Sequence, residues 1–387
     1  MGYVAIKGGE DAIENASRLV EYERVCSRTT PLEIEQIKTQ LSALVDKIMG
    51  EGSLYAPEHA ALALKQVQGC PLEGAFILRA YRATLNRVYY SDIIDTRAMR
   101  VSRRISSAFR EAPGGQILGP TRDYTVRLLN TDLASESKED FERFIDEVDG
   151  LDRTLLEDPQ SFSKIMDILL EQGMLQGVDD DEDNRVVDVT REAVKFPAPR
   201  SAALQMLARA ETGGLCALAY SSMRGFGSAH PTIGELRVGK AKIHVRDRRG
   251  RRRCIGSIKV TETEVISKLK KKGRDSVPYM TLGYGLCFGH NETKSICMGI
   301  LDRTMRVNDE HPANSQEFVL YHTEGVESYG FTNHLKLPHY VTFQSGLDNL
   351  RKAMERKDDS RNGDKQKKTA NTPMAEEDAM DPAQELL

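Results

Sequence analysis

Apolar residues recur at intervals of three and four from residue 8 to about residue 112, which is the spacing of one face of an α-helix. Pro57 stands where a first helical turn accepts proline. The pattern predicts an N-terminal helical bundle, and we expect this domain to span residues 1–130. The predicted helical stretches are 8–25, 32–49, 57–69 and 72–90.

The helical spacing stops in "PGGQILGPTRDYTVRLL", residues 113–129, and then predicts a further helix that carries Arg122, Asp123 and Arg127. A glycine loop that leads into a helix beside arginines suits an anion, because free N–H groups and the positive end of the helix dipole would face it. An ordinary loop before a helix explains the same residues, since they match neither a P-loop nor a dinucleotide fingerprint.

From residue 131 onward the pattern of charged, glycine and β-branched residues differs from that of the helical region. Residues 131–195 are richly charged, and we interpret them as a variable acidic insert or linker without chemistry. From residue 196 a helix is followed by a glycine-rich loop and by strand-like segments, of which "AKIHV" and "CIGSIKV" flank "RDRRGRRR" and predict a hairpin with a basic tip. "MTLGYGLCFGHNETKSICMGILDRTMR" predicts a strand that leads into a helix.

These patterns together predict an α+β fold. An N-terminal helical bundle is followed by a mixed α/β C-terminal domain at residues 196–351. Residues 352–387 are charged and contain no aromatic side chain, so they are predicted to be a disordered tail.

Charge and composition exclude several function classes. The 387 residues carry 54 Lys and Arg against 58 Asp and Glu, a net charge of -4 that argues against a general nucleic-acid binder. No uninterrupted apolar run approaches the length of a membrane span, so a soluble, cytoplasmic protein is expected. The six cysteines show no C-x-x-C pair and no zinc-ribbon or iron–sulfur spacing, and we expect mostly buried, reduced thiols.

Two of the eight histidines, His334 and His339, flank a stiff turn in "FTNHLKLPHYV", residues 331–341. Five residues rotate a side chain by roughly 140° along a helix and reverse it along a strand, so neither element brings the two rings together. Pro338 excludes a helix interior and favours an irregular bend. Such a bend could turn both rings toward one metal ion, whereas separate hydrogen bonds to the local backbone are the plainer explanation.

Three loops remain as candidates. "YSSMRGFGSAHP", residues 220–231, could present Arg224, His230 and backbone N–H groups to phosphate or phosphonate oxygens, although a tight turn with a solvent-facing arginine explains it as well. The glycines of "GYGLCFGH", residues 283–290, favour close packing over a dinucleotide site, because no βαβ frame surrounds them. The arginine-rich tip could bind nucleic acid, phosphate or an acidic partner surface, although a solvated hairpin tip needs no ligand.

Several uncommon words occur together in this chain: "YVAIKGGEDAI" near the start, "ALALKQ", "LRAYRATL", "RRIS", "PGGQILGPTRDYTVRLL", "ALAYSSMRGFGSAHP", "GYGLCFG", "ILDR" and "EFVLYHTEGVESYGFTNHLKLPHYV". In this order they closely resemble the PhnI family, subunit I of the carbon–phosphorus lyase core complex. The likeness covers most of residues 3–129 and 196–345 and fades through the middle insert, the basic tip and the tail.

The resemblance implies a phosphonate-catabolism protein that works with subunits G, H and J, and with a partner of the ATP-binding-cassette type. The implied reaction displaces the purine of ATP or GTP at C1′ by an alkylphosphonate, and subunit I is associated with nucleosidase activity toward purine nucleoside triphosphates. An alternative is a scaffold subunit that contributes a docking surface and an interfacial zinc site to the radical SAM partner.

The resemblance also suggests residues for these tasks. His334 and His339 fall on its H-L-K-L-P-H word, which implies a zinc ion completed by water or by the partner; Mg²⁺ is a further candidate, because it accompanies nucleotide phosphates. Phosphate groups call for cations, and glycosidic chemistry calls for carboxylates. The substrate-binding candidates are Arg122, Arg127, Arg224, His230 and Lys336, and the catalytic candidates are Asp123, Glu235, Asp302 and Glu317.

Overall fold

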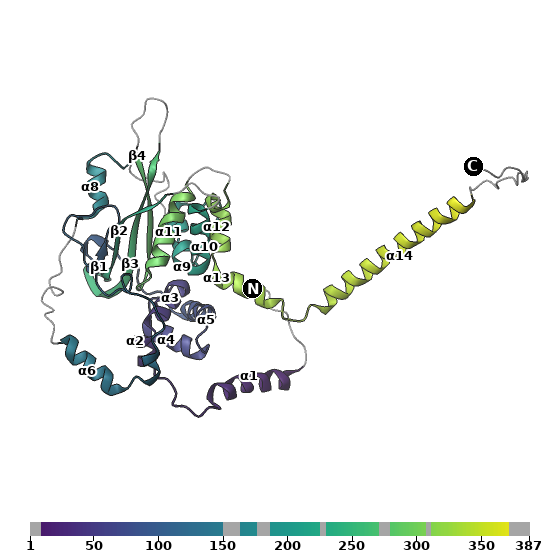
Figure 1. Cartoon of the computed structure of the whole chain (residues 1–387), viewed down its shortest axis with the longest axis horizontal. Coiled ribbons are helices and arrows are strands. Elements are labelled where there is room, and N and C mark those ends of the chain that lie inside the picture. The colour runs from purple at the N-terminus through teal and green to yellow at the C-terminus, as the bar shows by residue number, and fades with distance from the viewer. Residues whose placement is uncertain are drawn as a thin grey trace, which may run out of the picture. The chain divides into compact units, whose positions relative to one another are not determined.

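The computed structural model of the chain describes residues 9–149, 163–175, 186–224, 230–270, 279–306 and 311–370. By its internal contacts the chain divides into two units, one over Glu10–Gly330 and a second that contains the described residues from Phe331 onward. The first unit holds the mixed α+β fold that the sequence predicts (Figure 1).

The N-terminal helices form where the apolar spacing predicts them. They are α1 (Glu10–Val25), α2 (Ile34–Gln40), α3 (Ser42–Gly52), α4 (Pro57–Gln66) and α5 (Pro71–Thr84). Helices α2 to α5 enclose a core that includes Ile37, Ile48, Leu64 and Leu78, whereas α1 buries none of its residues. Proline begins both α4 and α5, where a missing N–H costs no hydrogen bond.

The helical pattern was expected to reach residue 112, and this part of the prediction is wrong. After Thr84 the chain runs through the short helix η1 (Thr96–Ala98) into strand β1 (Arg100–Ile105). The charged segment "RVSRRI" forms a strand because β2, more than 130 residues further along the chain, supplies its hydrogen-bonding partners. The first strand of the sheet therefore comes from the predicted helical domain.

The segment after β1 also differs from expectation. Residues 120–129 form turns and extended chain in place of the predicted helix. Leu128 and Leu129 are 81% and 91% exposed, so this segment lacks the packed apolar face that gives most protein helices their stability. The helix N-terminus that would have faced an anion is therefore missing. Downstream lie η2 (Thr131–Ser135), α6 (Lys138–Asp149) and α8 (Ile165–Glu171), and the acidic run at 179–183 is outside the described residues.

A four-stranded antiparallel sheet in the order β1-β2-β3-β4 forms the centre of the first unit. Its longer strands are β2 (Thr232–Arg246), β3 (Arg252–Lys270) and β4 (Tyr279–Phe288), and the predicted hairpin with a basic tip joins β2 to β3. Four arginines at and beside the tip form ion pairs with Asp92 or Asp247, so its positive charge is partly balanced within the chain.

Helices cover one face of this sheet. They are α9 (Arg200–Arg209), α10 (Thr212–Met223), α11 (Glu292–Thr304) and, after η3 (Pro312–Asn314), α12 (Gln316–His322) (Figure 1). Helix α11 packs directly on β4, where a Cβ on Gly283 would lie 1.9 Å from the Gly299 carbonyl oxygen. The glycines of "GYGLCFGH" thus permit close packing, as predicted.

The C-terminal elements are α13 (Gly325–His334) and α14 (Tyr340–Ala370). Between them residues 335–339 form the irregular bend predicted around Pro338. The predicted tail begins inside α14: residues 352–361 are exposed on this helix, and residues 371–387 lie outside the described residues. Because α14 has no apolar stripe there, it has no face to bury.

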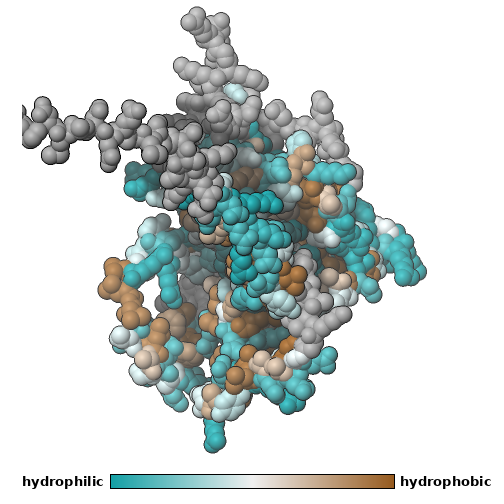
Figure 2. All heavy atoms as spheres, turned by 90° about the vertical axis from the view of Figure 1, so that its right-hand side faces the viewer, coloured by the Kyte–Doolittle hydropathy of each residue, from teal (hydrophilic) through white to brown (hydrophobic). Residues whose placement is uncertain are grey.

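Many large apolar side chains are exposed on the surface. In the view of Figure 2, apolar residues reach the surface in several separate groups among hydrophilic ones. The largest exposed fractions include those of Val126 and Leu129 in the irregular segment after β1. Within the described residues no helix is both long and apolar enough to span a bilayer.

The prediction that most cysteines are buried is wrong. None of the six forms a disulfide in the structure, and only Cys287 and Cys297 are buried, while Cys26, Cys216 and Cys254 are exposed. The spacing of cysteines along the sequence carries no information about whether each one faces the core or the solvent.

Candidate functional site

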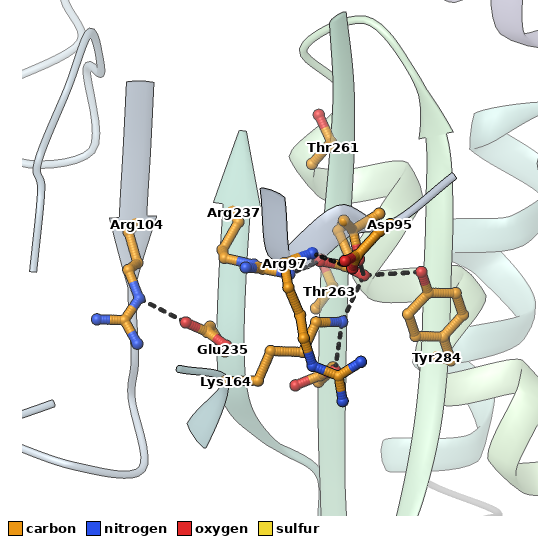
Figure 3. A network of polar contacts seen from close by, with 12 residues as sticks. Asp95, Arg97, Arg104, Lys164, Glu235, Arg237, Thr261, Thr263 and Tyr284 are labelled. Carbon is orange, nitrogen blue, oxygen red and sulfur yellow. Dashed lines mark hydrogen bonds and ion pairs between the residues drawn. The ribbon is translucent and has the colours of Figure 1, made fainter. Parts of the chain in front are cut away.

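Seven polar side chains lie on the sheet face opposite α11. We call them the polar cluster: Arg104, Lys164, Glu235, Arg237, Glu262, Glu264 and Tyr284. Alternate residues of a strand point to the same face, and the strand register places Arg237 beside Glu262, and both Glu235 and Tyr284 beside Glu264. Figure 3 shows members of the cluster from β1, β2 and β4 together with Lys164, which precedes α8.

Glu262 is the centre of the polar cluster and is only 2% exposed. Its Oε1 accepts hydrogen bonds from Thr96 Oγ1 at 2.7 Å, Lys164 Nζ at 2.8 Å and Tyr284 OH at 2.8 Å. Its Oε2 is paired with the Arg237 guanidinium. Burial by itself would raise the pKa of Glu262, but the charges of Arg237 and Lys164 and these hydrogen bonds hold it at about 2. Glu262 is therefore ionised at neutral pH.

Glu264 behaves in the opposite way. It shares Lys164 with Glu262, at 3.1 Å from its Oε1, but its buried Oε2 has no hydrogen-bond partner among the described residues. Burial raises the pKa of Glu264 to about 7, since Lys164 offsets only part of this effect and the Glu262 charge adds to it. Two carboxyl groups two residues apart are thereby prepared for different protonation states, a pattern that acid–base sites use.

A cavity of about 390 Å³ adjoins the polar cluster. Its volume falls in the range of small-molecule sites. The walls are mostly apolar, with Ile94, Leu204, Leu286, Phe288 and Met298 among them. Thr96 and Tyr284 also line the cavity, and both donate hydrogen bonds to Glu262, so this carboxylate lies one hydrogen bond behind the wall. Burial raises the pKa of Tyr284 far above its usual range and keeps it a neutral donor.

A second polar site surrounds Arg103 on β1. This arginine is fully buried and donates to Glu292 Oε1 at 2.7 Å, to Asp123 Oδ2 at 2.5 Å and to the Leu118 carbonyl at 2.6 Å. Its neighbour Arg104 donates to the Pro113 and Gly115 carbonyls at 2.7 Å each. The glycine loop at 113–119 therefore presents carbonyl oxygens to two internal arginines.

The two histidines of the bend form a separate pair in the C-terminal unit. The rings of His334 and His339 have centroids 5.1 Å apart. His334 Nδ1 is bonded to the Phe331 carbonyl, and His339 Nδ1 lies 2.6 Å from the Leu337 carbonyl. Because Nδ1–H donates to these carbonyls, each Nε2 keeps the lone pair that a metal ion needs. No group of three or more metal-binding side chains exists among the described residues, and the zinc site predicted at His334 and His339 stays a prediction.

Comparison with known proteins decides the family. Residues 2–357 match the family profile described as "Bacterial phosphonate metabolism protein (PhnI)". The chain belongs to the PhnI family.

Individual PhnI relatives agree over nearly their whole length. The alpha-D-ribose 1-methylphosphonate 5-triphosphate synthase subunit PhnI of Rhizobium meliloti (strain 1021) is 42% identical over 94% of this chain and 98% of its own. The protein of the same name from Escherichia coli (strain K12) is 40% identical over 91% of this chain and 98% of its own. The putative C-P lyase subunit protein HtxH of Stutzerimonas stutzeri is 48% identical over 92% of this chain and 97% of its own. The family resemblance expected from the sequence is thereby confirmed.

The structure brings only one of the four carboxylates predicted for PhnI catalysis, Glu235, into the polar cluster. Glu235 accepts from Arg104 Nε at 2.5 Å. Asp123 pairs with Arg103. Asp302 is buried against Arg200 and the Tyr284 backbone N–H, which ties α11 to β4. Glu317 is exposed at the start of α12.

The predicted substrate-binding residues of this PhnI-family chain are all exposed. Arg122, Arg127, Arg224 and His230 do not line the cavity, and Lys336 belongs to the C-terminal unit. Arg127 pairs with Asp123 at 3.3 Å. The loop at 225–229 lies outside the described residues. The roles assigned to these five residues stay predictions.

Sequence reasoning missed Glu262, Glu264, Lys164 and Tyr284. A signal for two of them was present in "VTETEVI", where two carboxylates alternate inside a strand that is otherwise rich in β-branched residues. Such a pattern predicts two acids on one sheet face. Lys164 could not be found in this way, because it comes from the segment interpreted as a linker.

Proposed function

We propose that this chain is the subunit of a carbon–phosphorus lyase assembly that joins a purine nucleoside triphosphate to an alkylphosphonate. The C1′–N bond to the base breaks, the base leaves with its electron pair and takes up a proton, and a phosphonate oxygen forms the new bond at C1′. The observation that carries the proposal is the 40 to 42% identity, over more than nine-tenths of both chains, to two proteins named as subunits of this synthase.

The cavity supports the proposal with suitable chemistry. Its apolar walls suit a nucleobase, and Tyr284 OH and Thr96 connect it to the ionised Glu262. A fixed negative charge behind the wall would stabilise the positive character that develops at the sugar when the base departs. In this proposal Tyr284 touches the substrate, and Glu262 and Lys164 position Tyr284 and set the local charge.

The surface supports a role within an assembly. Large apolar side chains that protrude from an irregular segment are typical of surfaces that partner chains cover. Residues 118–133 provide them, and those that protrude are Leu118, Tyr124, Val126, Leu128, Leu129 and Leu133. Subunits G, H and J, and an ATP-binding-cassette partner, are the partners that we propose. Mg²⁺ would enter as part of the nucleotide substrate.

A second function, favoured by the histidine pair, is a scaffold role at a shared zinc site. His334 and His339 would each bind zinc through Nε2, and two protein ligands leave positions for water or for a partner chain. A bound zinc ion would supply a Lewis acid at that interface. The two functions are compatible, because the histidine pair belongs to the C-terminal unit and the cavity is formed within the first unit.

One experiment tests both functions. The chain is purified together with its G, H and J partners, zinc is measured, and the products from ATP and methylphosphonate are separated by chromatography for the wild type and for His334→Ala/His339→Ala. We expect the wild-type complex to release adenine and to form the ribose 1-methylphosphonate product, and the double variant to lose zinc while product formation stays within about threefold. Absence of adenine release from the wild type would refute the synthase proposal, and absence of zinc would refute the metal site.

A further inference from the structure

Arginines gather at one side of the cavity. They are Arg79 and Arg82 on α5, Arg87 just after α5, and Arg209 at the end of α9. Arg209 itself lines the cavity, and Arg87 donates to Thr190 Oγ1, another lining residue, at 3.0 Å. Of these four arginines only Arg209 is a lining residue; Arg87 reaches the wall through Thr190, and Arg79 shares the carboxylate of Glu324 with Arg209.

Most of these arginines have carboxylate partners. Glu324 binds Arg79 at 2.8 Å and lies 2.7 Å from Arg209 Nε, close enough for an ion pair although the angle is poor for a hydrogen bond. Arg87 pairs with Asp188. Among the described residues, two carboxylates thus pair with three of these four guanidinium groups, and the fourth, Arg82, has none.

Arg82 is the arginine without a partner. It makes no hydrogen bond or ion pair in the described part of the chain, although its Nη1 atom is buried. Arg82 follows Arg79 by three residues on α5, so the two side chains lie on one face of the helix. Burial lowers the pKa of Arg82, and the charges of Arg79, Arg209 and Arg87 lower it further, while the charge of Asp188 acts against them. Arg79 Nε is also buried without a hydrogen-bond partner. Buried donors and like charges are costly unless an acceptor with negative charge joins them.

We propose that Arg82, together with Arg79 and Arg209, binds the phosphate chain of a nucleotide whose base and sugar occupy the adjoining cavity. Guanidinium groups match phosphate oxygens through paired hydrogen bonds, and a polyphosphate supplies several acceptors at once. A cavity of about 390 Å³ with apolar walls is larger and less polar than a lone small phosphonate needs. The inference rests on the proposed function in taking a nucleoside triphosphate as the ligand.

The test uses the full-length chain and isothermal titration calorimetry. ATP, sodium tripolyphosphate, adenosine and methylphosphonate are titrated separately into the wild type and into Arg82→Gln. We expect the variant to bind ATP and tripolyphosphate at least about tenfold more weakly and adenosine equally well, because only the charge-assisted contacts are removed. Arg18→Gln is the matched control, since Arg18 is an exposed arginine of α1 that lines no cavity, and it should bind all four ligands like the wild type.

Thermal unfolding without ligand separates binding from a structural role. Arg82→Gln removes a cation from among like charges, so its Tm should equal or exceed that of the wild type, and tripolyphosphate should raise the Tm of the wild type more than that of the variant. A lower Tm for Arg82→Gln with unchanged tripolyphosphate affinity would overturn the proposal. So would methylphosphonate binding that depends on Arg82 while ATP binding does not. If tripolyphosphate binding depends on Arg82 as expected but the wild-type complex releases no adenine, the synthase proposal alone fails.

Discussion

Replacing Glu262 by glutamine is expected to lower the free energy of unfolding by about 3 to 5 kcal/mol, the usual cost of removing one partner from a buried ion pair. The side chain keeps its size, but Arg237 and Lys164 lose the negative charge that compensates their burial. Both cations are nearly inaccessible to water, so solvent cannot replace the lost partner.

Chemical denaturation monitored by circular dichroism would measure this effect. Glu171→Gln is the matched control, because Glu171 is exposed at the end of α8 and forms no ion pair within the described residues. The control should change the free energy of unfolding by less than about 0.5 kcal/mol. If Glu262→Gln were equally mild, the buried network would not have the electrostatic balance described here.

Glu264 should make the stability of the protein fall as the pH rises toward neutrality. Its pKa of about 7 in the folded chain exceeds the ordinary value of 4.5, so between these values the folded state keeps a proton that the unfolded state releases. The contribution is complete below pH 4.5 and is lost as the pH rises through 7. The shift amounts to roughly 3 kcal/mol.

The variant Glu264→Gln imitates the protonated form and should remove this slope. Unfolding free energies measured at several pH values from 5 to 8 should fall for the wild type and fall less for the variant. The Glu262 carboxyl cannot produce the effect, because its pKa of about 2 places its own contribution below pH 4.5 and gives it the opposite sign. Parallel curves for the two proteins would mean that Glu264 is ionised in the folded state.

Short sequence patterns correctly predicted the elements that are determined by residues close together in the sequence. Helices α2 to α5 follow from their apolar spacing, and the β2–β3 hairpin follows from two strand-like runs around a polar tip. The bend between α13 and α14 follows from Pro338, whose ring restricts the backbone on both sides.

Long-range pairing explains what local patterns could not predict. Strand β1 is rich in arginine, and two of its arginines can be buried because Arg103 meets Glu292 and Arg104 meets Glu235, more than 130 residues away. The opposite error occurred at residues 120–129, where a helical pattern had no partner surface to pack against.

The candidate site also depends on contacts between residues that are far apart in the sequence. Glu262 gains its low pKa from Arg237 on another strand and from Lys164 in a segment that seemed to be a linker. The arginines beside the cavity meet Glu324 across 245 residues in the case of Arg79. The sequence alone does not reveal which distant residue a carboxylate or an arginine will contact. The predicted site residues were therefore chosen from recognisable motifs, whereas other residues line the cavity.

The central claim is that base displacement takes place in the cavity beside Tyr284. The most direct measurement is adenine release from ATP and methylphosphonate by the complex that contains Ala208→Phe, a substitution that places a phenyl ring in the cavity. Ala43→Phe, which adds the same group at an exposed position of α3, is the control. For complexes that purify with all partners, we predict that Ala208→Phe lowers adenine release by about a hundredfold or more and that Ala43→Phe leaves it unchanged. Undiminished release by Ala208→Phe would show that the reaction takes place elsewhere.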